Sequence, residues 1–174
     1  MKALPDVRLP PLAERHGTPF YLYDWDVMAE RVRSLEAFDV IRYAQKANSN
    51  IHILRKMREL GVVVDAVSEG ELERALRAGY SGHSDPSGVV YTADIISQET
   101  LELITKLGVP MNAGSPDMLA QLGRVKRGHK VWLRINPGFG HGHSRKTNTG
   151  GEWSKHGIWH EHIGENGRNT WTCV

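Results

Sequence analysis

Three observations predict an α/β protein of the (β/α)8 TIM-barrel type. Short runs rich in Val, Ile and other apolar residues begin at intervals of 20 to 27 residues. Segments with apolar residues three or four positions apart lie between these runs, as in helices that bury one face. No Gly-x-Gly-x-x-Gly turn follows the first run. Regular strand–helix repetition indicates a parallel sheet, and the missing turn favours a barrel over an open, doubly wound sheet.

The predicted strands are nearly continuous apolar runs, which is typical of parallel strands buried on both faces. They cover residues 40–44, 62–66, 89–92, 109–112 and 130–135. A complete barrel has eight strand–helix units in about 250 residues. Five units therefore predict an incomplete barrel, and an open five-stranded α/β sheet is the alternative fold.

Four predicted helices alternate with the strands. Their apolar stripes lie within residues 51–60, 71–78, 96–107 and 118–122. Ser68, Ser97 and Ser115 stand where a hydroxyl can cap free backbone N–H groups, and Glu71 completes a capping box with Ser68. Several helices are predicted to end on a glycine, which readily adopts the left-handed cap conformation. These glycines are Gly61, Gly79, Gly108 and Gly123.

Composition divides the chain after residue 136. Residues 137–174 hold eight of the 18 glycines and three of the five tryptophans, but no Leu, Ala or Met. Because such a segment buries little aliphatic surface, we expect loop or poor order there. The predicted domains are therefore 1–136, the N-terminal part of a barrel that holds the core, and 137–174, a Gly/His-rich loop and divergent tail.

Charge and apolar patterning exclude several classes of function. The 22 basic and 20 acidic residues leave a net charge of +2, which gives no electrostatic footprint for nucleic acid. No apolar run approaches the roughly 20 residues that a membrane helix needs. The first residues lack the apolar region of a signal peptide, so we expect a cytoplasmic location. Cys173 is the single cysteine, which excludes an internal disulfide.

In both candidate folds, the functional face lies at the carboxyl ends of the strands. The first predicted strand runs there into Lys46, the second ends with Asp65, and the fifth carries Arg134. Partial desolvation of a lysine at such a position favours the neutral amine, which can attack a carbonyl group. The residues alone allow two interpretations of Lys46, a Schiff-base lysine or a surface lysine at a strand end.

Four motifs occur in order along the chain. They read YAQKAN at 43–48, VDAVSEGEL at 64–72, RINPG at 134–138, and TNTGGE followed by SKHGI within 147–158. The first two resemble the fold-type III pyridoxal-phosphate (PLP) enzymes, the barrel group of alanine racemase and ornithine decarboxylase. The order and spacing of all four resemble the diaminopimelate decarboxylase family over residues 15–161.

This resemblance implies PLP as the cofactor and Lys46 as the lysine that forms a Schiff base with it. It places Ala44 beside the cofactor ring, and it places Asp65 and Arg134 in the hydrogen-bonding shell around ring and lysine. Lys155 matches a position that contributes to dimer contacts, so a homodimer is implied for the full-length family. The implied activity is decarboxylation of a small amino-acid substrate, meso-diaminopimelate, to L-lysine, without nucleic-acid or membrane partners.

Other motifs of the family do not occur in this sequence. These are the phosphate loop HIGSG, the motif EPGR, and the cysteine–glutamate pair and tyrosine of a C-terminal β-domain. Residues 162–167 echo the phosphate loop but follow Lys155 too closely, with no predicted strand between. Cys173 lacks the neighbours of the family cysteine. We therefore expect this chain alone to be inactive, because it lacks the N–H cradle that holds a phosphate.

Two alternatives to that function stay open. One is a non-catalytic barrel fragment that binds PLP weakly or binds another part of a barrel. The other is a different fold-type III enzyme, either a basic amino-acid decarboxylase or an amino-acid racemase.

Five histidines gather near the end of the chain, at His141, His143, His156, His160 and His162. His-x-His and His-x-x-x-His spacings are able to ligate Zn²⁺ or Ni²⁺. No cysteine or carboxylate completes a regular set of four ligands. We therefore expect a polar loop over the barrel top and no metal site.

Overall fold

The computed structural model describes residues 9–142 and 148–163. The chain divides into two compact units, Met1–Asp39 and Val40–Val174. The composition did not predict this division, and the predicted boundary after residue 136 stays a prediction. The first unit contains α1 (Leu9–His16) and α2 (Trp25–Arg33). Asp24 caps α2, because its carboxylate accepts a hydrogen bond of 2.9 Å from the backbone N–H of Asp26.

The second unit is built on a parallel sheet of five strands. In sequence order these are β1 (Arg42–Ala44), β2 (Val63–Ala66), β3 (Val89–Tyr91), β4 (Met111–Ala113) and β5 (Val131–Leu133). Each strand pairs in parallel with the next one along the chain. The predicted parallel α/β architecture is confirmed.

A helix follows each of the first four strands. β1 continues first into a short 3-10 helix, η2 (Gln45–Ala47). The four α-helices are α3 (Ile51–Glu59), α4 (Glu69–Arg77), α5 (Gln98–Lys106) and α6 (Pro116–Val125). In the described part of the chain, no helix is long and apolar enough to cross a membrane.

The capping residues of these helices are largely those predicted. The hydroxyls of Ser68, Ser97 and Ser115 accept hydrogen bonds from backbone N–H groups in the first turns of α4, α5 and α6. Gly61, Gly79 and Gly108 follow α3, α4 and α5 with φ of 76°, 94° and 64°. The prediction for Gly123 is wrong, because α6 continues to Val125. A glycine tolerates helical dihedral angles, and Val125 beyond it packs against the core cluster.

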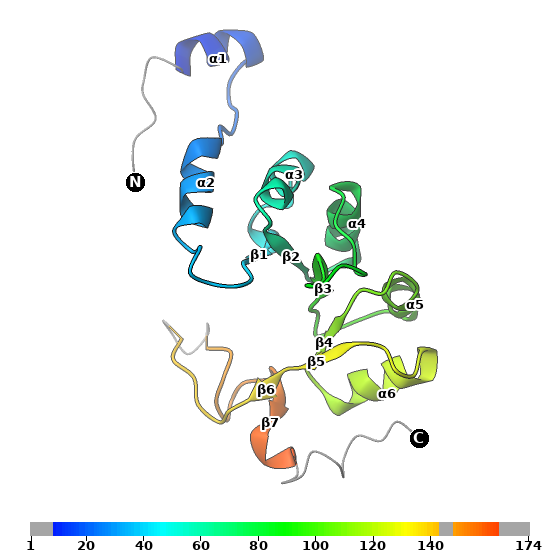
Figure 1. The fold of residues 1–174 in the computed structure, drawn as a ribbon. Helices are drawn as coiled ribbons and strands as arrows, with labels where there is room; N and C mark the ends of the chain where they lie inside the picture. The colour runs from blue at the N-terminus through cyan, green and yellow to red at the C-terminus, as the bar shows by residue number, and fades with distance from the viewer. Residues whose placement is uncertain (1–8, 143–147, 164–174) are drawn as a thin grey trace. The chain divides into compact units, whose positions relative to one another are not determined.

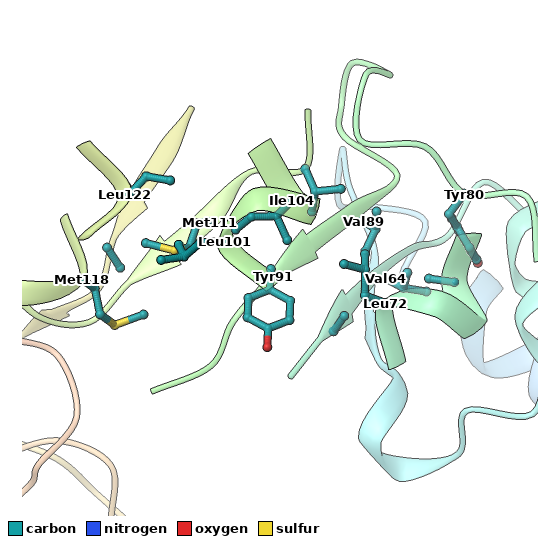
Figure 2. Close-up of a cluster of buried hydrophobic side chains, with 14 of the residues drawn as sticks. Val64, Leu72, Tyr80, Val89, Tyr91, Leu101, Ile104, Met111, Met118 and Leu122 are labelled. Carbon is teal, nitrogen blue, oxygen red and sulfur yellow. The ribbon is translucent and has the colours of Figure 1, made fainter. Parts of the chain in front are cut away.

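The core lies between the sheet and α3–α6 (Figure 2). Alternate strand residues such as Val64, Val89 and Met111 face the helices and are fully buried. The residues between them, including Asp65 and Asn112, therefore face the other way. We call this second face of the β1–β5 sheet the inner face.

The sheet curves strongly around its inner face. If it were flat, β1 and β5 would lie about 19 Å apart, which is four strand spacings of about 4.8 Å. Yet the Arg42 guanidinium carbon of β1 lies only 5.0 Å from the centre of the Trp132 ring of β5. Figure 1 shows β1–β5 along an arc with α3–α6 on its outer side. This curvature is that of a partial (β/α) barrel and not of an open sheet.

A second, two-stranded sheet follows β5. β6 (Ile135–Asn136) pairs in parallel with β7 (Ile158–Trp159), and η4 (His160–His162) comes next. Composition predicted loop or poor order from residue 137 onward, and the structure differs at 158–162. Ile158 is only 3% exposed and joins the core cluster, and Ile163 packs against that cluster, so aliphatic residues of this segment help to anchor β7. β7 also stands between Lys155 and His162, where no strand was predicted.

Candidate active site

Lys46 lies immediately beyond the carboxyl end of β1. It occupies the middle of η2, and the Tyr43 hydroxyl closes this turn by donating a 3.1 Å hydrogen bond to the Asn48 carbonyl. The Lys46 side chain is exposed and makes no hydrogen bond or ion pair with any other described residue. The partial desolvation expected from the sequence is therefore not seen, because its neighbours Ala44 and Ala47 are small and exposed.

Two of the predicted site residues, Ala44 and Asp65, are neighbours across β1 and β2. They are partners in the parallel register, so their side chains leave the same face of the sheet side by side. That face is the inner face, because Val64 and Ala66 on either side of Asp65 belong to the core. The small Ala44 side chain leaves the space above it open, while Asp65 places a carboxyl group beside it.

Arg42 lies on the same inner face, two residues before Ala44. Its guanidinium donates hydrogen bonds of 2.9 Å to the Val64 carbonyl and 3.3 Å to the Ser87 carbonyl. Burial lowers the pKa of Arg42, and the nearby Asp65 carboxylate opposes that effect. Arg42 thus forms a hydrogen-bonded layer beneath the Ala44–Asp65 pair.

Four residues at this edge carry buried polar atoms without a hydrogen-bond partner among the described residues. The atoms are Oδ1 of Asp65, Oδ1 of Asn112, both side-chain amide atoms of Gln45, and Nδ1 of His156. Gln45 is fully buried in η2, next to Lys46. Buried polar groups normally have partners, so these atoms mark an edge of the sheet suited to a polar ligand.

Arg134 follows β5 and stands in a cluster of charged side chains. Its Nη1 lies 3.9 Å from Oδ1 of Asp94, which follows β3. The other carboxylate oxygen, Oδ2, lies 2.8 Å from Nδ1 of His156. Among the described residues, Arg134 makes no hydrogen bond or ion pair with Lys46, Ala44 or Asp65. Of the predicted site residues, the structure therefore brings Ala44 and Asp65 together and leaves Lys46 and Arg134 apart from them.

A polar loop borders Arg134 on the other side. The Asn136 side chain is buried and donates a 2.9 Å hydrogen bond to the Gly151 carbonyl. Its Oδ1 accepts from the backbone N–H groups of Gly138 and Gly151, at 3.1 and 2.9 Å. A pocket of about 370 Å³ opens at this loop. Its lining residues include Arg134, Pro137, Phe139, His141, Asn148 and Thr149.

The histidine cluster is only partly described. His143 lies outside the described residues, as does Cys173. Among the remaining residues, no group of three or more His, Cys, Asp or Glu side chains is arranged to hold a metal ion. His141 lines the pocket and His156 contacts Asp94, so the cluster does not converge on one point.

Four residues at this edge are not among the site residues that the sequence analysis predicted. Arg42 and Gln45 flank Ala44 within the first motif, and period-two alternation along β1 was a signal for Arg42. Asp94 and His156 meet only through tertiary structure, because 62 positions separate them in the chain. No local pattern links a pair so far apart in sequence.

Chemically, this edge combines an exposed primary amine, a carboxyl group and a guanidinium. An amine of this kind can attack a carbonyl carbon. The carboxyl and guanidinium groups can orient a polar ligand through charge-assisted hydrogen bonds.

Comparison with known proteins relates the chain to one family. The family described as "Pyridoxal-dependent decarboxylase, pyridoxal binding domain" matches residues 26–169. The chain is 63% identical to diaminopimelate decarboxylase of Streptomyces coelicolor over 163 residues, which cover 94% of the chain and 37% of that relative. It is 60% identical to the Escherichia coli K12 enzyme over 149 residues, which cover 86% of the chain and 36% of the relative.

Solved structures agree with this match. A crystal structure of diaminopimelate decarboxylase superposes with a TM-score of 0.80 at 61% identity, covering 85% of the chain and 35% of that structure. The Helicobacter pylori diaminopimelate decarboxylase complexed with L-lysine gives 0.77 at 31% identity, covering 86% and 39%. The chain thus spans about a third of the length of the relatives it matches.

Proposed function

Because the chain belongs to the pyridoxal-dependent decarboxylase family, we propose that it supplies the lysine side of a PLP site that decarboxylates meso-diaminopimelate to L-lysine. One observation carries the proposal. Lys46 stands at the carboxyl end of β1, beside the inner-face pair formed by Ala44 and Asp65. The identity to diaminopimelate decarboxylases supports the substrate, and no observation favours a racemase or another basic amino-acid decarboxylase.

The residues at this edge fit the cofactor. PLP is a planar ring with polar substituents. The small Ala44 side chain leaves space for a ring, and Oδ1 of Asp65 and Oδ1 of Asn112 are buried acceptors that lack donors among the described residues. A ligand that presents N–H or O–H groups satisfies such acceptors.

The residues of this chain have distinct roles in the proposed site. When bound, PLP supplies an electron sink for the negative charge left on the α-carbon after CO₂ departs. Lys46 provides the amine that attaches the cofactor, and Asp65 accepts hydrogen bonds from groups beside Ala44. Arg42 fixes the layer beneath them through Val64 and Ser87. Arg134 adds a positive charge at the end of β5.

We propose that this chain alone does not complete the reaction. Its sequence holds neither of the family motifs HIGSG and EPGR, which bind phosphate and the pyridine nitrogen in the family it resembles. We also propose a cytoplasmic location. A homodimer through Lys155 is a further proposal, supported by the exposure of that side chain.

A PLP titration followed by visible absorption tests the proposed attachment. We expect a saturable band for the chain and for the control Lys106→Ala, which removes an exposed lysine of α5. Lys46→Ala should abolish the band. A band of equal strength in Lys46→Ala would contradict the role of Lys46.

Decarboxylation is tested separately. The chain is mixed with a polypeptide that carries the remaining part of a relative, and CO₂ release from meso-diaminopimelate is measured. We expect release only in the mixture and none with Lys46→Ala. Failure of release in a mixture that binds PLP would contradict the catalytic assignment while leaving the cofactor site intact.

A further inference from the structure

We propose that Asp94 is a positioning residue that orients Arg134 and His156 together at the carboxyl edge of the sheet. The importance of Arg134 rests on the proposed function, whereas the positioning itself is a property of this chain. Neither Asp94 nor His156 belongs to the residues assigned above to the cofactor.

The three side chains come from separate segments that converge at one point. Asp94 follows β3, Arg134 follows β5, and His156 precedes β7. The Asp94 side chain is 44% exposed, that of Arg134 31% and that of His156 24%. The carboxylate is thus partly shielded from water, which strengthens its attraction to both neighbours.

The backbone around Arg134 makes this point a junction between the two sheets. The Arg134 N–H donates a 2.9 Å hydrogen bond to the Ala113 carbonyl of β4, and the Arg134 carbonyl accepts a 2.8 Å bond from the N–H of Ile158 in β7. The backbone of Arg134 thus joins β4 to β7 through hydrogen bonds. At the same place the Asp94 carboxylate contacts the side chains of Arg134 and His156, and so holds these two side chains where the backbone is already held.

The contact with His156 sets the state of the imidazole ring. Nδ1 is buried and lies 2.8 Å from Oδ2 of Asp94, with no hydrogen-bond partner among the described residues. A modest rotation of the partly exposed carboxylate brings the two groups into line for a hydrogen bond. A carboxylate can only accept, so we infer that Nδ1 carries a hydrogen. In the neutral ring with that tautomer, Nε2 keeps a free lone pair.

The contact with Arg134 orients the guanidinium toward the pocket. Arg134 lines the 370 Å³ pocket, and it is the only lining residue there with a permanent positive charge among those that the structure describes. The 3.9 Å separation from Asp94 leaves the other guanidinium nitrogens available to a ligand. Asp94 therefore holds the charge at the pocket wall without covering it.

Nuclear magnetic resonance of the cofactor-free chain tests the proposal with two variants of Asp94. Asp94→Asn keeps an acceptor oxygen for Nδ1 but removes the charge that attracts Arg134. Asp94→Ala removes both. Asp85→Ala, which changes an exposed aspartate before β3, serves as the control. The readouts are the ring ¹⁵N shifts of His156, which report its tautomer, and the Nε–H signal of Arg134, assigned through its loss in Arg134→Lys.

We expect the tautomer of His156 with hydrogen on Nδ1 in the unchanged chain, in Asp94→Asn and in the control, and its loss in Asp94→Ala. We expect the Arg134 signal to shift and to exchange faster with water in both Asp94 variants, but not in the control. Retention of the tautomer in Asp94→Ala, or an unchanged Arg134 signal in Asp94→Asn, overturns the proposal. A variant that unfolds shows broad changes in backbone signals, and the other variant then decides the matter.

Because these readouts need no cofactor, they are independent of PLP binding by Lys46. A failed PLP titration would overturn the proposed function and leave the positioning by Asp94 standing. Failure of the resonance test would overturn the positioning by Asp94 and leave the proposed function standing.

Discussion

Arg42 shows how a charged side chain is kept on the inner face of a curved sheet. Its guanidinium donates to the carbonyls of Val64 and Ser87 and stacks on the ring of Trp132. These contacts replace water around a group whose pKa is lowered by burial. The charge is therefore part of the structure beneath the proposed cofactor site, and not a surface feature.

Replacing Arg42 by methionine keeps most of its length and removes the donors and the cation–π contact. We expect Arg42→Met to lower the free energy of unfolding by about 1–3 kcal/mol, because buried acceptors lose their donors. Urea unfolding followed by far-ultraviolet circular dichroism measures this. The control Arg127→Met changes an exposed arginine and should stay within about 0.5 kcal/mol of the unchanged chain. Equal effects of the two substitutions would show that the contacts of Arg42 do not contribute.

Tyr80 gives the fold a dependence on alkaline pH. Its hydroxyl donates a 3.0 Å hydrogen bond to the Leu54 carbonyl, and its side chain is buried at 6% exposure. Burial raises the pKa of Tyr80 from 10.0 to about 12, while Arg58 opposes the shift. Because the folded state holds this proton more tightly, its stabilising contribution is full below pH 10 and is lost as pH rises from 10 toward 12.

Comparison of the chain with Tyr80→Phe isolates this effect. At neutral pH we expect the variant to be less stable by about 0.5–1.5 kcal/mol, because one hydrogen bond is lost. Between pH 10.0 and about 12 the unchanged chain should lose stability more steeply than the variant. The pKa of Tyr91 is also raised, by burial and by Glu69 and Glu71, but Tyr91 is present in both proteins and its effect cancels. If the urea midpoints of the unchanged chain and of Tyr80→Phe fall by the same amount across this pH range, the pH dependence does not come from Tyr80.

At the scale of single elements, serine caps fix where the helices begin. The Ser97 hydroxyl accepts a 3.1 Å hydrogen bond from the Thr100 N–H at the start of α5. The Thr100 hydroxyl in turn donates a 2.9 Å bond to Glu69 at the start of α4. The two helix N-termini are thus linked near the carboxyl edge of the sheet.

Removal of this cap should be measurable. We expect Ser97→Ala to lower the free energy of unfolding by about 1 kcal/mol and Ser97→Asp to retain most of it, because aspartate also caps helices well. Thermal or urea unfolding of both variants provides the test. If Ser97→Asp loses as much stability as Ser97→Ala, the loss comes from packing and not from capping.

The same elements show which features a sequence can predict. Strands β1–β5, helices α3–α6 and their serine caps follow from local patterns, because alternation and capping act over a few residues. β7 escaped prediction because it depends on Ile158 reaching a core formed far earlier in the chain. The helix end at Gly123 was misplaced because a glycine can also lie within a helix.

Some features of the candidate site could be predicted from the sequence and others could not. The places of Lys46, Asp65 and Arg134 at strand ends were predictable because the strands themselves were predictable. The Asp94–His156 contact and the layer formed by Arg42 and Trp132 depend on how the sheet curves. Curvature results from the packing of all four helices on one face, which no local pattern encodes.

At the scale of the second unit, β5 presents an unpaired edge and exposed apolar side chains. β5 is the last strand of its sheet and, among the residues that the structure describes, pairs only with β4. Trp132 and Leu133 of β5 are 38% and 42% exposed, and Ile135, which begins β6, is 47% exposed. An uncovered parallel edge of this kind is a template for pairing with another strand. We therefore expect the isolated chain to self-associate as its concentration rises.

A charge placed on this edge should suppress that association. Lysine on an edge strand opposes strand addition because pairing would bury its charge. In sedimentation velocity over a range of concentrations, Leu133→Lys should remain monomeric where the unchanged chain associates. The control Leu60→Lys changes an apolar residue that is 38% exposed at the end of α3, away from the edge, and should associate as before. If both variants associate equally, the contact lies elsewhere on the chain. If both stay monomeric, general charge and not the β5 edge governs the association.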